Sequence, residues 1–212
     1  LTITDTADAS SFDVGDGNDT INVDDVNSNF VVVGGAGTDN FATALNLVST
    51  LIGGDGSDTI TIDGAGARTM GATFTMSSIE KLNITAAGAA VEMSGAQLAG
   101  SGTLEITGTG GDDTFVVQSA STATAAKSID GTGVTLATGS DATIQYKGAV
   151  GVDNISGGVA AEQIFYSAGN DVITGGGTGV DTFHGQAGND HLYGFASNDI
   201  LTGGDGHDKI VG

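Results

Sequence analysis

The chain has 212 residues, among them 37 glycines and 26 acidic residues against five Lys and Arg, for a formal net charge of −21. This charge argues against nucleic acid and anionic membrane as partners and favours divalent cations. The lack of Cys excludes disulfides and thiolate metal sites, and no apolar run reaches the length of a membrane-spanning helix.

Glycine–aspartate turns recur at wide intervals in the first part of the chain. Leu1-Thr2-Ile3-Thr4 predicts a first strand, and the turns VGDGNDTI, GGAGTDNF, GGDGSDTI and GTGGDDTF follow, with a degenerate copy at 129–136. Their last acidic residues are Asp19, Asp39, Asp58 and Asp113. The first three lie 20 and 19 residues apart. Residues 1–147 are therefore predicted to form a β-solenoid of about 20-residue coils with sparse metal-binding turns.

A shorter repeat fills residues 148–212. Its units follow the nonapeptide G-G-x-G-x-D-x-U-x, where U is large and apolar, and the acidic position recurs every nine residues with a single interval of ten. Two nonapeptides make one coil, so this region is predicted to be a tighter roll with metal-binding turns on both sides. The acidic positions are Asp153, Glu162, Asp171, Asp181, Asp190, Asp199 and Asp208.

The position two residues after each acidic residue tests the repeat. Side chains alternate between the two faces of a strand, so this position should always face the core. All eleven residues there are large and apolar, which low-complexity disorder would not produce: Ile21, Phe41, Ile60, Phe115, Ile155, Ile164, Ile173, Phe183, Leu192, Leu201 and Ile210. The predicted fold class is all-β, a parallel β-roll or β-helix solenoid.

The glycines and acidic residues of the turns form a set of oxygen ligands. Glycine permits tight turns whose carbonyl oxygens point inward, and the acidic side chain adds a carboxylate. Such hard ligands favour several Ca²⁺ ions over Mg²⁺ or Zn²⁺. The carbonyl ligands are expected near Gly34, Gly35, Gly37, Gly53, Gly54, Gly56, Gly176, Gly177, Gly179, Gly185, Gly188, Gly194, Gly203, Gly204 and Gly206.

Stacked coils should place each ion between turns that are one coil apart. The predicted pairs are Asp19 with Asp39, Asp39 with Asp58, Asp153 with Asp171, Glu162 with Asp181, Asp171 with Asp190, Asp181 with Asp199, and Asp190 with Asp208. Ala160 replaces a glycine in the Glu162 turn, which is predicted to be the weakest site, and Ser197 and Asn198 make the Asp199 turn irregular. Without metal the carboxylates repel, so we predict a largely disordered chain that Ca²⁺ folds at dissociation constants of roughly 10⁻⁴–10⁻³ M.

These motifs resemble known families. Residues 148–211 resemble the repeats-in-toxin (RTX) calcium-binding proteins, which implies a β-roll, a bacterial source and export by a type I system. In the first part, GGDGSDTITI (53–62) followed by TFTMSSIEKLNITAAGAA (73–90) is similar to RTX-type surface-layer proteins, in which a GGxGTD turn precedes an I-E-x-L strand. That resemblance implies lattice formation on the cell surface.

The sequence carries no recognisable catalytic motif. It has no HExxH, GxSxG or Cys nucleophile, and His184, His191 and His207 follow a strand or occupy variable repeat positions, so no enzyme is predicted.

The predicted function is a secreted calcium-binding structural protein that self-associates into a surface layer or extracellular filament, with cell-surface polysaccharide as a further partner. The alternative is the calcium-folded export module of a larger toxin, adhesin or secreted hydrolase. Because solenoids normally carry caps and this chain stops in mid-repeat, we expect a piece of a longer protein.

Overall fold

A computed structural model shows a chain built almost entirely of short parallel strands. It describes residues 2–3, 11–23, 30–43, 50–64, 66–99, 102–109, 113–118, 127–140, 142–165 and 168–212. They form two compact units, each described separately below. The first comprises residues 1–93, 97–114 and 136–142, and the second 94–96, 115–135 and 143–212. The predicted boundary at 147/148 lies between two kinds of repeat, whereas these two units are defined by which residues lie close together. The predicted boundary therefore stays a prediction.

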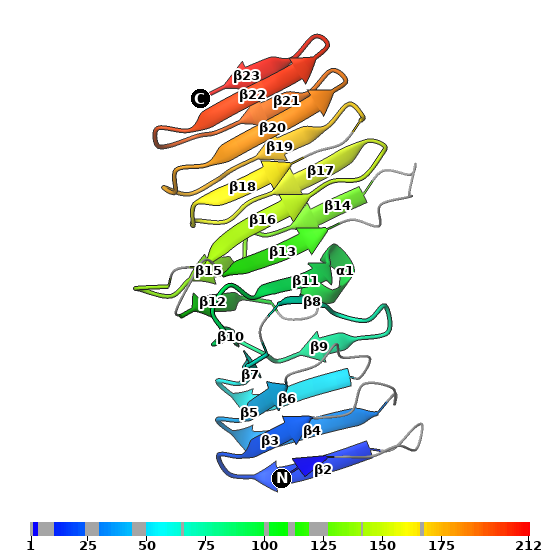
Figure 1. Cartoon of the computed structure of the whole chain (residues 1–212), viewed down its shortest axis with the longest axis vertical. Helices are drawn as coiled ribbons and strands as arrows, with labels where there is room; N and C mark the ends of the chain where they lie inside the picture. The colour runs from blue at the N-terminus through cyan, green and yellow to red at the C-terminus, as the bar shows by residue number, and fades with distance from the viewer. Residues whose placement is uncertain are drawn as a thin grey trace. The chain divides into compact units, whose positions relative to one another are not determined.

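In the first unit, the strands up to residue 62 alternate between two parallel sheets (Figure 1). One sheet runs in the order β1 (Thr2–Ile3), β3 (Thr20–Val23), β5 (Asn40–Thr43), β7 (Thr59–Ile62), β10 (Lys81–Ile84) and β12 (Leu104–Gly108). The other runs β2 (Ser11–Asp16), β4 (Val31–Gly37), β6 (Thr50–Gly56) and β9 (Thr75–Ser77). Strands β8 (Ala67–Thr69) and β11 (Ala90–Ser94) also pair in parallel, and one short helix follows, α1 (Gly95–Leu98). The described residues include no helix with the length and hydropathy needed to cross a bilayer.

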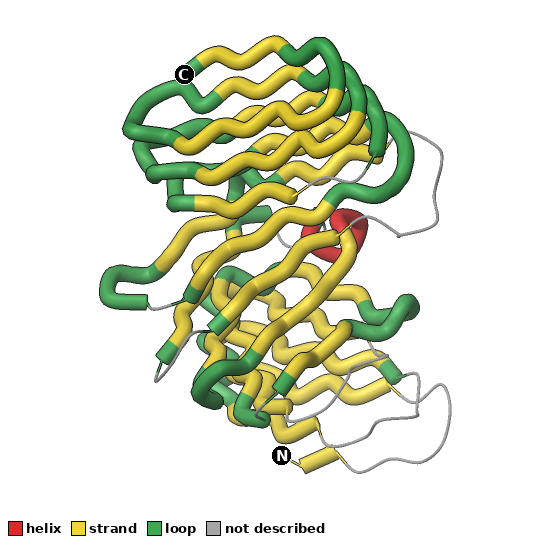
Figure 2. Tube along the Cα trace, turned by 45° about the horizontal axis from the view of Figure 1, so that its top comes forward, coloured by secondary structure: helices red, strands yellow, loops and turns green. Residues whose placement is uncertain are grey.

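The second unit repeats this plan with shorter coils. One sheet contains β13 (Thr114–Gln118), β16 (Thr143–Lys147), β18 (Glu162–Phe165), β20 (Thr182–Ala187) and β22 (Ile200–Asp205). The facing sheet contains β14 (Lys127–Asp130), β17 (Asp153–Ser156), β19 (Val172–Thr174), β21 (His191–Tyr193) and β23 (Lys209–Val211), and β15 (Val134–Leu136) lies between β14 and β16 in sequence. Figure 2 shows the turns of this unit stacked at both edges of its sheets.

The strand register stacks equivalent repeat positions. Ile155 pairs with Ile173, which pairs with Leu192. On the facing sheet, Ile164 pairs with Phe183. Because each pairing joins positions one coil apart, the apolar residue of every nonapeptide lies beside its equivalent in the next coil. The solenoid fold predicted from the repeat spacing is confirmed.

The core consists of the apolar residues that follow each turn. Nine of the eleven predicted residues are buried, and each contributes about 1.5–3 kcal/mol on burial. The expectation is wrong for the last two. Leu201 is only partly buried and Ile210 is 48 % exposed, because β22 and β23 are edge strands with a neighbouring coil on one side only.

Candidate metal sites

The glycines of each turn let the coils approach closely. In the turn that begins at Gly53, the second and fourth residues, Gly54 and Gly56, have φ of 117° and 137°. These are left-handed conformations that side chains rarely adopt. A Cβ on Gly56 would also collide with the carbonyl oxygen of Gly37 on the preceding coil. Glycine is therefore needed both for the shape of the turn and for its stacking.

A ladder of hydrogen bonds joins the acidic residues of successive turns. In each case Oδ1 of the later residue accepts a hydrogen bond from the backbone N–H of the earlier one, at 2.8–3.0 Å. All seven predicted pairs are brought together in this way: Asp19/Asp39, Asp39/Asp58, Asp153/Asp171, Glu162/Asp181, Asp171/Asp190, Asp181/Asp199 and Asp190/Asp208. The spacing in the sequence equals one coil, which is why the pairs were predictable.

The second carboxylate oxygen of most of these residues is buried without a hydrogen-bond partner. Among the described residues this holds for Oδ2 of Asp19, Asp39, Asp58, Asp171, Asp181, Asp190 and Asp199, and for Oε2 of Glu162. Burying an ionised oxygen with no compensating partner is costly, and buried charges are normally paired or coordinate metals. These oxygens therefore point to a cationic partner.

The unpartnered oxygen faces a backbone carbonyl of the next coil in five cases: Asp39, Asp58, Glu162, Asp181 and Asp190. A Cβ placed on Gly34 would collide with Oδ2 of Asp39 and lie 2.7 Å from the carbonyl oxygen of Gly53. A Cβ on Gly185 would likewise meet Oδ2 of Asp190 and lie 2.6 Å from the Gly203 oxygen. In these turns the first glycine thus leaves room for a carboxylate oxygen and a carbonyl oxygen, contributed by two coils, to converge. We call each such arrangement a cradle.

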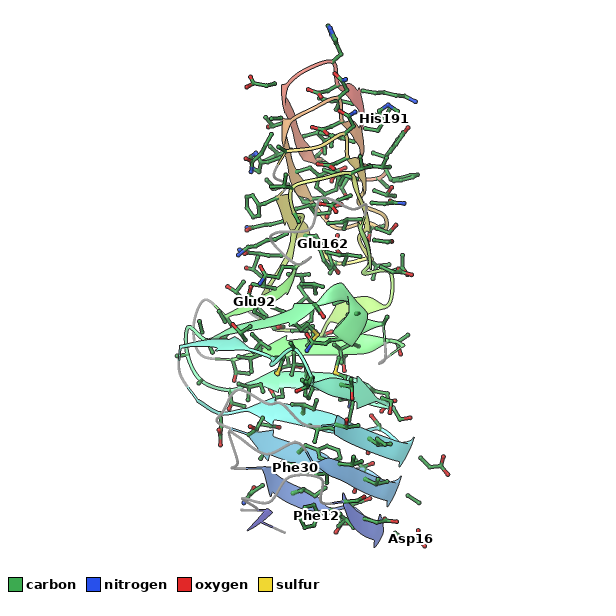
Figure 3. All side chains as sticks on the ribbon, turned by 90° about the vertical axis from the view of Figure 1, so that its right-hand side faces the viewer. Phe12, Asp16, Phe30, Glu92, Glu162 and His191 are labelled. Atoms are coloured by element: carbon green, nitrogen blue, oxygen red, sulfur yellow. The ribbon has the colours of Figure 1, made fainter. Side chains whose placement is uncertain are left out.

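Two further cradles lie on the opposite turns of the second unit. A Cβ on Gly157 would be 2.9 Å from Oε2 of Glu162 and 2.6 Å from the carbonyl oxygen of Gly175. At Gly175 it would meet Oδ2 of Asp181 and lie 3.2 Å from the oxygen of Gly194. Glu162, labelled in Figure 3, thus occupies the same place as the aspartates despite its longer side chain.

The donor set of the cradles fits Ca²⁺. Within the described part of the chain no group of three or more His, Cys, Asp or Glu forms, so the ligands of each cradle are a carboxylate oxygen and backbone carbonyls. Ca²⁺ accepts six to eight such oxygens in flexible geometry. A calcium ion there would be held by the acidic residue of one turn and by glycine carbonyls of that turn and the next.

Comparison with known proteins agrees with this geometry. A family model described as the RTX calcium-binding nonapeptide repeat matches residues 49–61, 147–173 and 175–210. The chain carries RTX calcium-binding repeats. RTX solenoids are a structural, calcium-binding type of fold. No curated protein and no solved structure matches the chain significantly. The resemblance of the first unit to surface-layer proteins stays a prediction.

Burial raises the pKa of several carboxyl groups in the RTX turns. Burial, together with the neighbouring Asp181, raises the pKa of Glu162 to about 8. Burial also raises the pKa of Asp171 to about 6, with the charges of Asp190 and Asp153 adding to the effect. The pKa values of Asp58, Asp181 and Asp190 are raised too, again chiefly by burial. Charge at these positions is thus unfavourable unless a cation compensates it.

Three predicted ligands differ from this arrangement. Asp113 accepts hydrogen bonds at both carboxylate oxygens, from the N–H of Ala89 at 2.9 Å and of Thr109 at 3.0 Å. Asp153 accepts the Ala149 N–H at 2.7 Å, and Glu162 uses Oε1 to accept the Gly158 N–H at 3.0 Å. Asp113 therefore lacks the unpartnered oxygen that defines the cradles. Whether each predicted residue binds an ion stays a prediction.

The Asp199 turn is irregular in composition but not in conformation. Phe195 and Ser197 stand where other turns have their second and fourth residues, and they adopt φ of 69° and 132°. Gln186, in the turn before Asp190, also has a left-handed φ, of 72°. These side chains occupy the left-handed region that glycine fills elsewhere. The turn geometry therefore overrides the conformational preference of the residue, at a cost of about 1–2 kcal/mol for each.

A second ladder, which the sequence did not predict, runs beside the acidic one. Oδ1 of Asn18 accepts the N–H of Thr38 at 2.9 Å. Asn170 accepts the N–H of Asn189, and Asn189 that of His207, both at 2.8 Å. Here the earlier residue accepts from the later coil, opposite to the direction of the acidic ladder. The recurring Asn-Asp pair in the sequence was the available signal.

Proposed function

We propose that this chain is a secreted calcium-binding structural protein whose coils fold around several Ca²⁺ ions and which assembles as a surface layer or extracellular filament. The observation that carries the calcium part of the proposal is the array of buried, unpartnered carboxylate oxygens facing carbonyl oxygens of the next coil. An ion in each cradle joins two coils and compensates a charge whose burial is otherwise unfavourable.

Ion binding and folding are one process in this proposal. A cradle needs two stacked coils, so it does not exist in the unfolded chain, and the free energy of ion binding adds to that of folding. Affinities of roughly 10⁻⁴–10⁻³ M, typical of extracellular calcium modules, keep the chain unfolded in the cytosol and fold it outside the cell. This suits export by a bacterial type I system, the typical route of RTX proteins.

Exposed apolar side chains support self-association of the second unit. Val159, Val180 and Phe195 are 57 %, 52 % and 61 % exposed, and they lie on three successive turns along one edge of its sheets. We call this row the apolar ridge. Aromatic and aliphatic side chains gathered on one surface are typical of interaction sites. A second copy of the chain supplies a matching apolar surface, whereas cell-surface polysaccharide is the proposed partner for anchoring.

Circular dichroism tests the calcium part. The protein is measured in about 5 mM Ca²⁺, a concentration above the expected affinity range, then with excess EGTA, and again after Ca²⁺ is restored. We expect the β-sheet signal to collapse with the chelator and to return with the ion, while Mg²⁺ at the same concentration restores little. A β-sheet signal that survives the chelator unchanged contradicts the proposal.

Substitution of the apolar ridge tests assembly. The double variant Val159→Ser/Val180→Ser should remain monomeric by analytical ultracentrifugation at millimolar Ca²⁺, where the wild-type chain assembles into arrays visible by negative-stain microscopy. The matched control is Val150→Ser/Val152→Ser, which changes two valines that are 47 % and 49 % exposed on a turn at the opposite edge. A wild-type chain that stays monomeric at high concentration overturns the assembly part and leaves the calcium part standing.

The match to the RTX repeat also favours a second candidate function. The same repeats fit the calcium-folded export module of a larger toxin, adhesin or secreted hydrolase. Sequencing the gene beyond both ends of this chain separates the two: further surface-layer-like repeats favour the first function, and an adjoining catalytic or adhesive domain favours the second.

A further inference from the structure

We propose that Asp58, Ser78 and Glu80 form a calcium site whose second side, at Ser78 and Glu80, is supplied by a corner outside the nonapeptide repeats. The inference rests on the proposed function, because it takes the cradle geometry as a calcium site. The match to the RTX repeat ends at residue 61 in this part of the chain, so Ser78 and Glu80 lie outside it. They belong to the segment Ser77-Ser78-Ile79-Glu80-Lys81 between β9 and β10.

Strand register places Ser78 opposite the first glycine of a turn. Ile52 of β6 pairs with Ser77 of β9, so the next residue along each strand, Gly53 and Ser78, also correspond. Ser78 has a φ of 50°, one of four positive values among the described non-glycine residues. The chain therefore turns sharply at Ser78, at the point where the preceding coil begins its GGDGSD turn.

Glu80 then takes the place of the acidic residue that would close a normal turn. Its Oε2 accepts the backbone N–H of Asp58 at 2.8 Å, as Oδ1 of Asp58 accepts that of Asp39 at 2.8 Å. The acidic ladder thus continues by one step beyond the last GGxGxD turn of this unit. The carbonyl oxygen of Asp58 in turn accepts the N–H of Glu80 at 3.1 Å, which fixes the corner.

Glutamate stands at a corner that is shorter than a normal turn. Four residues separate Gly53 from Asp58, but only Ile79 separates Ser78 from Glu80. The short corner thus carries the longer acidic side chain, and its carboxylate reaches the Asp58 N–H. Ile79 is fully buried, so the corner is anchored in the core and cannot shift to accommodate a shorter side chain.

The same pair of oxygens converges here as in the other cradles. Asp58 is fully buried, and its Oδ2 has no hydrogen-bond partner. A Cβ on Gly53 would collide with both this Oδ2 and the carbonyl oxygen of Ser78. Asp58 Oδ2 and the Ser78 carbonyl are therefore the proposed direct ligands, and Glu80 is a positioning residue that holds the Asp58 backbone and adds negative charge.

The structure offers a substitution that separates this site from its neighbour. In the Asp39 cradle the Asp58 side chain takes part only through Oδ1, which accepts a hydrogen bond from the Asp39 N–H. In its own cradle Asp58 contributes the unpartnered Oδ2. Asp58→Asn keeps a side-chain carbonyl oxygen for the first role and replaces Oδ2 with an amide that cannot bind a cation. Asp39→Asn has the corresponding effect on the Asp39 cradle. Asp63→Asn is the control, since it removes a charge from an exposed side chain of the same unit.

Native mass spectrometry of the full chain, titrated with Ca²⁺ alone, counts the ions. We expect Asp39→Asn and Asp58→Asn each to bind one ion fewer than the wild-type chain, and Asp63→Asn to bind the same number. If Asp39→Asn loses an ion and Asp58→Asn does not, the site at Asp58 is overturned and the proposed function stands. A wild-type chain that binds no Ca²⁺ overturns the proposed function itself.

A second variant keeps the test informative if Asp58→Asn fails to fold. Glu80→Asp retains the charge but withdraws the carboxylate from the Asp58 N–H, and loss of such supporting contacts typically lowers metal affinity by about 10- to 100-fold. We expect one ion of the titration to weaken by that factor, while Glu105→Asp, on the neighbouring strand β12, leaves the titration unchanged. An unaltered titration for Glu80→Asp contradicts the proposal.

Discussion

The two units use one kind of turn in two different ways. In the first unit the GGxGxD turns lie 19 and 20 residues apart and form a single acidic ladder, from Asp19 to Asp58 and on to Glu80. In the second unit acidic turns recur about every nine residues and form two ladders, one at each edge of the sheets. The comparison shows that the turn is an independent element, and that the spacing of its copies sets how many acidic turns each coil carries.

The apolar core is larger in the first unit, which has fewer acidic turns. Strand β7 of the first unit buries both Ile60 and Ile62, whereas β19 and β21 of the second unit are three residues long and bury only Ile173 and Leu192. Fewer buried side chains mean less stabilisation from the core. We therefore expect the second unit to depend more on bound Ca²⁺ than the first.

Hydrogen exchange measured by mass spectrometry should show the largest difference between the units. On removal of Ca²⁺ we expect the amides of β17 to β23 to lose nearly all protection, because two ladders are released at once. Amides of β4 to β7 should keep more protection, because their core is larger. An equal loss of amide protection in both units would show that the larger core of the first unit does not make it more stable without Ca²⁺.

Glycine substitutions test the shared turn. Gly188→Ala places a Cβ against the carbonyl oxygen of Gly169, and Gly56→Ala does the same against Gly37. We expect each to lower the free energy of unfolding at saturating Ca²⁺ by about 3 kcal/mol or more, from left-handed strain and overpacking together. The control is Gly88→Ala, where φ is also positive, at 68°, but the new Cβ meets open space, and it should cost about 1–2 kcal/mol.

The pH dependence should differ between the calcium-free and calcium-bound states. The pKa of Glu162 is raised to about 8 and that of Asp171 to about 6, so the folded calcium-free chain binds more protons than the unfolded chain between pH 4 and 8. Its stability must then fall as the pH rises through this range. With EGTA present, the β-sheet signal of circular dichroism should be stronger at pH 5 than at pH 8.

Saturating Ca²⁺ should remove or reverse that trend, since the ion binds the deprotonated carboxylates. Glu162→Gln, which cannot ionise, should flatten the calcium-free profile. A calcium-free signal that grows steadily from pH 5 to pH 8 would falsify this account of the buried acids.

The smallest expected effect concerns the turn that departs from the glycine pattern. Phe195→Gly and Ser197→Gly should each stabilise the calcium-bound chain by about 1 kcal/mol, because both replace a left-handed side chain. Ala196→Gly, between them, has no positive φ to relieve and should destabilise by about 0.5–1 kcal/mol. Thermal melts of the three variants measure these changes in stability within a single turn.

Regular spacing explains what could be predicted from the sequence. The seven acidic pairs and nine buried apolar residues followed from a repeat whose length equals a coil or half a coil. Asp58 was predicted, but the part of Ser78 and Glu80 beside it was not, because their corner has no glycine and is three residues shorter than a normal turn. The left-handed Phe195 and Gln186 were missed because stacking against the neighbouring coil, and not local preference, dictates their conformation.

The direction of the acidic ladder gives the solenoid a polarity of assembly. The backbone N–H of Asp39 donates its ladder hydrogen bond to Oδ1 of Asp58, and the carbonyl that faces the Asp39 carboxylate is that of Gly53. Both partners belong to the coil that follows Asp39. Removing a coil from the C-terminal side would thus take away the groups that face the carboxylate of the coil before it, whereas removing one from the N-terminal side would leave the later acidic pairs intact.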